Sequence, residues 1–172
     1  MKMLLPFSLR LSRSVLRLLI VLNLGAGLSI AALLAATFTA ERWTLDALGV
    51  PAEPAALVLG MRLVMVLGIA GVPLAHIVLA RLLAIVETVR GDDPFVLVNA
   101  ARLEAIAWAL LGLELLRLAV GAVAAAAAFR RAGIPIGWSF AATPWLSILL
   151  VFVLARVFER GASMRADLEG TV

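Results

Sequence analysis

The sequence predicts an all-α membrane protein in which four transmembrane helices form a bundle. Hydrophobic residues make up 64% of the 172 positions and charged residues only 15%, whereas soluble domains are about half apolar and about a quarter charged. The apolar stretches are on the order of twenty residues long, enough to cross the hydrocarbon core as helices. They do not alternate with a period of two, which argues against a membrane barrel. Helices are therefore expected, because they pair their own backbone polar groups in lipid.

The first two spans follow from two apolar runs and the polar stretch between them. The first span is predicted at about 15–37, behind a basic leader, and its length exceeds that of a typical signal-peptide core. The polar stretch 40–56 has room for one short interfacial turn. The second span is predicted at about 58–82. Pro73 within it removes a backbone donor, which predicts a kink.

The third span is predicted at about 103–129 and the fourth at about 142–162. An Asp-Pro pair before the third span is typical of a helix start, because aspartate caps free amides and proline lacks only an amide that would be unpaired anyway. These boundaries leave a loop at 87–102 and a charged tail at 163–172. The whole chain, 1–172, is then a single integral membrane domain.

The distribution of basic residues predicts that both termini are cytoplasmic. Lysine and arginine are concentrated near the N-terminus, around the loop 87–102 and at the C-terminal end, and the cytoplasmic side carries the excess of these residues. The net charge of +4 therefore reflects membrane orientation, and no direct binding of nucleic acid is expected. The abundance of alanine, leucine and valine, with Lys2 as the only lysine, indicates a bacterial protein from a GC-rich genome, and hence the inner membrane.

Composition and motifs give no support for an enzyme. The chain has no cysteine, which excludes disulfides and thiolate chemistry, and a single histidine, which excludes a multi-histidine metal site. Phosphate-binding glycine loops, nucleophile elbows and zinc-protease motifs are also missing from the sequence. No catalytic residue, metal or cofactor is predicted.

Two charged residues, Glu114 and Arg117, lie near the middle of the third span. A charge at that depth costs roughly 2.5–3.5 kcal/mol, and the spacing of three places the two on one helix face as a potential ion pair. His76 in the second span and Asn23 in the first could approach the same layer. Together they would form a proton-responsive or ligand-binding site, since histidine titrates nearest neutral pH. The alternative is a structural ion pair beside polar residues that each bond a backbone carbonyl.

Small residues predict where the helices approach each other most closely. Gly25 with Ser29 in the first span, and Gly68 with Gly71 in the second, are candidate contact points. Small side chains at such points allow helix backbones to pack tightly in lipid.

The loop before the third span and the C-terminal end resemble a bacterial membrane family. The string GDDPFV at 91–96, followed by Asn99, Arg102 and Leu103, resembles the "G-x-PF, then N, then RL" signature of the family domain of unknown function 2975. The string ARVFERGA at 155–162 is similar to that family's C-terminal region. The chain departs from the family in having two aspartates before the proline, and an inserted Glu-Gly in its tail.

The resemblance implies a four-span membrane protein without an established activity, often encoded beside a small helix-turn-helix DNA-binding protein. It therefore implies a membrane partner that senses a signal and holds or releases a cytosolic regulator. The residues expected to form the cytoplasmic interaction surface are Asp93, Pro94, Phe95, Asn99, Arg102, Arg156 and Glu159.

Two other functions stay open on the sequence. One is a transporter or channel subunit built around Glu114, Arg117 and His76, which requires a homo-oligomer because four short helices rarely enclose a path alone. The other is an immunity or stress protein that guards the bilayer against a toxin.

Overall fold

The computed structural model describes residues 5–49, 55–89, 97–127 and 141–169, and all regular structure in these ranges is helical. Four of the five helices are long and apolar enough to cross a membrane. The predicted all-α class with four candidate spans is thereby confirmed. The helices are α1 (Leu5–Thr39), α2 (Glu41–Ala47), α3 (Ala55–Val89), α4 (Leu97–Ala126) and α5 (Ala142–Glu169).

The helices are longer than the apolar runs that predicted them. α1 and α3 each contain 35 residues, about 52 Å of helix at 1.5 Å per residue, which exceeds the roughly 30 Å of a hydrocarbon core. Hydropathy detects only the part of a helix that lies in lipid, whereas backbone hydrogen bonding continues into the polar ends. The predicted interfacial turn is present as α2, and α3 continues as helix through Pro73.

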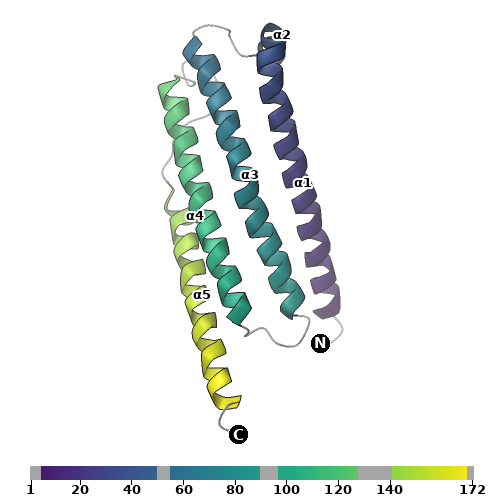
Figure 1. Cartoon of the computed structure of the whole chain (residues 1–172), viewed down its shortest axis with the longest axis vertical. Coiled ribbons are helices and arrows are strands. Elements are labelled where there is room, and N and C mark those ends of the chain that lie inside the picture. The colour runs from purple at the N-terminus through teal and green to yellow at the C-terminus, as the bar shows by residue number, and fades with distance from the viewer. Residues whose placement is uncertain (1–4, 50–54, 90–96, 128–140, 170–172) are drawn as a thin grey trace.

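The four long helices form an open row rather than the predicted bundle (Figure 1). Among the described residues, α1 packs on α3, α3 on α4 and α4 on α5, while α1 contacts neither α4 nor α5, and α3 does not contact α5. The physical reason is that lipid covers an apolar helix face as well as another helix does, so no hydrophobic force closes the row. Along the direction of the helix axes, the start of α1 and the end of α5 lie at the same end of the molecule, at the bottom of Figure 1.

We call this end of the helices the basic end, and it carries Arg13, Arg81, Arg102 and Arg156. The opposite end, which carries α2, is called the α2 end. A buried cluster near the α2 end joins Leu45 of α2 to residues of α3 and α4. A second buried cluster, nearer the basic end, contains residues of α4 and α5 with α3 packed against it. The row is thus held by separate apolar contacts at each level rather than by one central core.

Of the two glycines in α1, Gly27 lies close against α3, whereas the predicted Gly25 does not. A Cβ atom at Gly27 would lie 2.8 Å from Cγ2 of Val72, whereas a Cβ atom at Gly25 would meet nothing within 4 Å. The sequence could not show which glycine contacts α3, because the two lie on different sides of α1 and periodicity does not tell which side faces α3. The predicted pair Gly68 and Gly71 faces apolar side chains at ordinary contact distance, Gly68 on α1 and Gly71 on α4.

α5 is shifted parallel to the helix axes relative to α4, toward the basic end. Its first turn lies level with the middle of α4, since Pro144 and Ser147 line one cleft with Glu114 and Arg117. Its later residue Glu159 lies level with the first residue of α4, because both line a second cleft. Residues 160–169 therefore continue past the start of α4 by about 15 Å of helix, as Figure 1 shows.

Candidate functional site

The residues of the predicted interaction surface that the structure describes fall into two groups at the basic end. Asn99 and Arg102 are on α4, and Arg156 and Glu159 are on α5. Three further predicted residues, Asp93, Pro94 and Phe95, lie outside the described residues.

Arg102 joins the start of α4 to the last turns of α3. Its guanidinium Nη1 donates to the carbonyl oxygen of Ala84 at 2.9 Å, to the hydroxyl of Thr88, and to Oδ1 of Asn99 at 2.9 Å. Asn99 is completely buried, with 0% of its surface exposed. We call Arg102, Asn99, Thr88 and the Ala84 carbonyl the Arg102 cluster. It ties the start of α4 to the end of α3, and the buried Asn99 is not accessible to a soluble partner.

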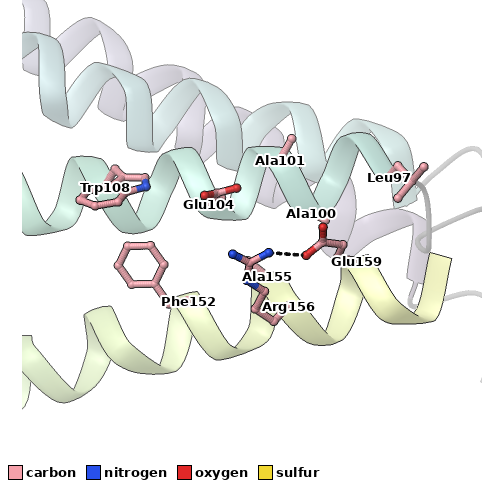
Figure 2. A pocket seen from close by; sticks show the side chains of 9 residues that line it. All are labelled: Leu97, Ala100, Ala101, Glu104, Trp108, Phe152, Ala155, Arg156 and Glu159. Atoms are coloured by element: carbon pink, nitrogen blue, oxygen red, sulfur yellow. Dashed lines mark hydrogen bonds and ion pairs between the residues drawn. The ribbon is translucent and has the colours of Figure 1, made fainter. Parts of the chain in front are cut away.

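Arg156 and Glu159 form an exposed ion pair on α5. Nη1 of Arg156 donates to Oε2 of Glu159 at 2.7 Å, and their spacing of three places both on one face of the helix. Both side chains line a cleft between α4 and α5 (Figure 2). This pair is accessible to a binding partner, unlike Asn99.

The ion pair expected between Glu114 and Arg117 is present near the middle of α4. Two guanidinium nitrogens of Arg117 donate to the two carboxylate oxygens of Glu114, at 2.6 and 2.9 Å. Glu114 is only 5% exposed. The two-point geometry pairs both carboxylate oxygens with planar donors, which is the strongest arrangement available to these groups. Such a pair makes a deeply placed charge tolerable in lipid.

The structure does not bring the predicted cluster of polar residues together. Asn23 donates through Nδ2 to the carbonyl oxygen of Val72 at 3.1 Å, which ties α1 to α3. Nδ1 of His76 is buried without a hydrogen-bond partner among the described residues. Because α1 and α4 do not touch in the described part of the chain, Asn23 and Glu114 sit on separate seams of the row. Asn23 therefore follows the alternative interpretation, in which a backbone carbonyl satisfies it.

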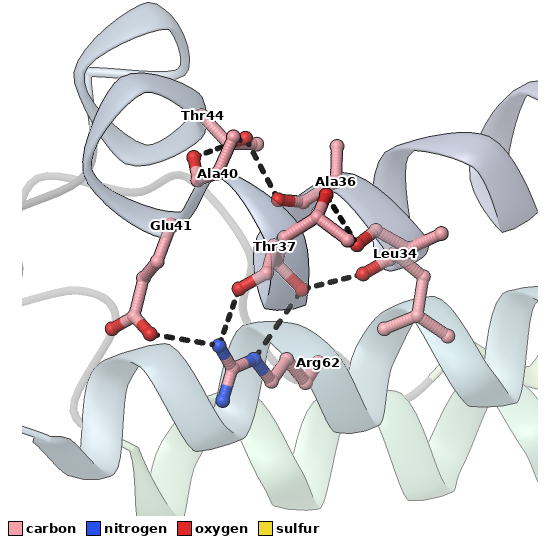
Figure 3. Close-up of polar contacts among 9 residues, drawn as sticks. Leu34, Ala36, Thr37, Ala40, Glu41, Thr44 and Arg62 are labelled. Atoms are coloured by element: carbon pink, nitrogen blue, oxygen red, sulfur yellow. Dashed lines mark hydrogen bonds and ion pairs between the residues drawn. The ribbon is translucent and has the colours of Figure 1, made fainter.

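A polar cluster at the α2 end was missed by sequence reasoning (Figure 3). Arg62 of α3 donates from Nη2 to the carbonyl oxygen of Thr37 at 2.6 Å and to Oε2 of Glu41 at 3.2 Å, and from Nε to the Thr37 hydroxyl at 3.3 Å. Its guanidinium carbon lies 4.2 Å from the centre of the Phe38 ring. We call these four residues the Arg62 cluster. The available signal was a lone arginine two turns into an apolar run, which lipid tolerates only with a partner.

A short polar contact extends this cluster to α2. The hydroxyl of Thr44 lies 3.2 Å from the carbonyl oxygen of Ala36 and 2.9 Å from that of Ala40. Thr44 is buried, as is the neighbouring Thr37. Both carbonyl oxygens also accept a backbone N–H, and the contact with Ala36 links α2 to the end of α1.

Within the described ranges, no group of three or more histidine, cysteine, aspartate or glutamate side chains is placed to hold a metal ion. Comparison of the chain with protein-family models, with curated proteins and with solved structures finds no match.

Proposed function

We propose that this protein is a membrane-bound regulator that holds a small helix-turn-helix DNA-binding protein at its basic end, on the cytoplasmic face of a bacterial inner membrane. The nature of the partner comes from the family resemblance of the loop and the C-terminal string. The place of binding comes from the arrangement of α4 and α5.

The projection of α5 is the observation that carries the proposal. Residues 160–169 continue beyond the first residue of α4, and Arg160 and Arg165 on this projection are exposed. Arg156 and Glu159 stand exposed at its base. A charged helical projection beyond the apolar part of the row has no use for crossing lipid, and it presents side chains that a soluble protein can reach.

The Arg102 cluster supports the same site by rigidity. Arg102 links α3 and α4 directly beside the loop that carries the family-like string. The start of α4 lines the cleft with Arg156 and Glu159, so a tie between α4 and α3 holds this part of the site in place and lowers the conformational entropy lost on binding.

The test is recovery of a partner from native membranes with variants that change only the projection. The tagged protein is purified in mild detergent and the co-purifying proteins are identified by mass spectrometry. We expect a small DNA-binding protein with the wild type, and its loss when Arg160→Glu and Arg165→Glu are combined. The matched control is Arg42→Glu, an exposed arginine on α2 at the opposite end, which should leave recovery unchanged.

Two results would contradict the proposal. One is the purification of the protein without any DNA-binding protein, and the other is equal recovery from the double variant and the control. Asn99→Ala is unsuitable as the first variant, because loss of a buried amide changes stability as well as the surface.

A second candidate is a proton-linked transporter subunit, favoured by the buried Glu114–Arg117 pair. The open row encloses no path by itself, so this function requires several copies. It predicts pH-dependent flux into liposomes that Glu114→Gln abolishes and Glu41→Gln, at the α2 end, leaves unchanged. Flux that is absent from the wild type, or that survives Glu114→Gln, would exclude it.

A further inference from the structure

The cleft between α4 and α5 at the basic end combines features that a regulatory surface alone does not explain. Its volume is about 250 Å³, below the roughly 300–1,000 Å³ of pockets that enclose drug-sized molecules. It opens between α4 and α5, which both carry exposed apolar residues, among them Val98 and Val153. A cleft of this size and place suits part of an amphiphile rather than a whole soluble metabolite.

The cleft has an aromatic end and a charged end. Trp108 and Phe152 close the first with their rings edge to face, 5.4 Å apart at 86°. Glu104, Arg156 and Glu159 surround the second (Figure 2). Parallel to the helix axes, the aromatic end of the cleft faces the part of α4 that carries Glu114, and the charged end faces the start of α4. The polarity therefore runs in the same direction as in a lipid, from chain to headgroup.

At the charged end of the cleft, the carboxylate of Glu104 has no hydrogen-bonded counter-charge among the described residues. Arg156 donates from Nη1 to Glu159 at 2.7 Å. Glu104 faces the same guanidinium closely enough to interact with it electrostatically, but it has no hydrogen-bond partner among the described residues. Two carboxylates and one guanidinium leave a net negative charge, while Arg156 retains N–H groups beyond the one bonded to Glu159. The set suits a ligand that carries both an ammonium donor and an anionic acceptor.

We propose that this cleft binds the headgroup of phosphatidylethanolamine. Its primary ammonium donates hydrogen bonds to Glu104, its phosphate accepts from the remaining N–H groups of Arg156, and its acyl chains run along Trp108 and Phe152. Phosphatidylcholine fits less well because its quaternary nitrogen has no N–H to donate. Phosphatidylglycerol fits less well because it brings an anion to two carboxylates and has no ammonium. This site does not depend on the proposed DNA-binding partner.

The test uses Trp108 as a reporter of which lipid occupies the cleft. The other tryptophans are removed by Trp43→Phe, Trp138→Phe and Trp145→Phe. The protein is then reconstituted into vesicles with brominated chains on phosphatidylethanolamine, phosphatidylglycerol or phosphatidylcholine, at equal mole fractions in an otherwise fixed mixture. We expect brominated phosphatidylethanolamine to quench Trp108 fluorescence most strongly.

Glu104→Gln should lower that preference about tenfold, which corresponds to about 1.4 kcal/mol of lost binding. The matched control is Glu87→Gln, an exposed glutamate near the same end that pairs with Arg13 on the other side of the row. Glu87→Gln should leave the preference intact. A second control is a protein with an unchanged cleft that retains Trp43 as its only tryptophan, and its fluorescence should show no lipid preference.

Equal quenching by the three lipids would overturn the proposal. A preference for phosphatidylethanolamine that persists in Glu104→Gln would overturn it as well, because the carboxylate would then have no role. Helix content measured by circular dichroism confirms that the Glu104→Gln protein is folded, so a loss of preference refers to the cleft.

Discussion

Two arginine-centred clusters join neighbouring helices at opposite ends of the row, and they differ in how the guanidinium charge is balanced. Arg62 bonds the Thr37 carbonyl across the α1–α3 seam and also reaches the carboxylate of Glu41. Arg102 bonds the Ala84 carbonyl across the α3–α4 seam, and its described acceptors are all neutral oxygens. Thr37 lies in the last turn of α1, where carbonyls lack partners within their own helix, whereas the carbonyl of Ala84 also accepts from the Thr88 hydroxyl of α3.

The difference lies in exposure. Glu41 is 52% exposed in its side chain, so water competes with Arg62 for it. Asn99 is completely buried, so its amide oxygen depends on donors that the protein supplies. The comparison teaches that a neutral buried acceptor can depend more on an arginine than an exposed carboxylate does, because the unpaired buried group has no water to replace the bond.

The largest effect is expected from Arg102→Met, which keeps the length of the side chain and removes its donors. Loss of the bonds to Ala84, Thr88 and the buried Asn99 should lower the free energy of unfolding by about 3 kcal/mol. The measurement is unfolding by a denaturing detergent in mixed micelles, followed by circular dichroism. Arg81→Met, at an exposed arginine of α3 near the same end, is the control, and equal stability of the two variants would contradict the assignment.

A smaller effect is expected from Arg62→Met. The buried Thr37 loses its donor, but Glu41 becomes solvated, so the loss should be about 2 kcal/mol. The same unfolding experiment applies, with the exposed Arg42→Met as its control. A loss larger than that of Arg102→Met would reverse the comparison between the clusters.

The smallest effect is expected from Glu41→Gln. Exposed ion pairs contribute about 0–1 kcal/mol, and raised salt should remove the difference from the wild type because it screens surface charges. Stability is compared at low and high ionic strength, with Asp46→Asn on the same short helix as the control. A loss that persists at high salt would mean that Glu41 is held in a drier setting than its exposure indicates.

The helices were predictable from the sequence because apolar length is a local property. The Glu114–Arg117 pair was predictable for the same reason, since a spacing of three fixes its geometry within one helix. The expected joint site of this pair with Asn23 and His76 is not formed. The sequence could not show this, because such a site depends on which helices touch. The Arg62 cluster was missed because its acceptors are mainly a backbone carbonyl and a threonine hydroxyl, which carry no charge pattern in the sequence.

The displacement of α5 relative to α4 was beyond the sequence for a related reason. Apolar helices in lipid can slide along each other with little change in buried surface, so hydropathy sets their length but not their level. Only specific contacts, such as the edge-to-face rings of Trp108 and Phe152, decide which residues lie opposite each other.

The open row also has a consequence for how the chain folds. Among the residues that the structure describes, every long helix packs only on the long helices next to it in the sequence, so each seam can form as soon as the later of its two helices has entered the membrane. Contacts between consecutive elements close short loops, which is the condition for rapid folding. Assembly can therefore proceed in the order of synthesis, with the α1–α3 seam complete before α5 has left the ribosome.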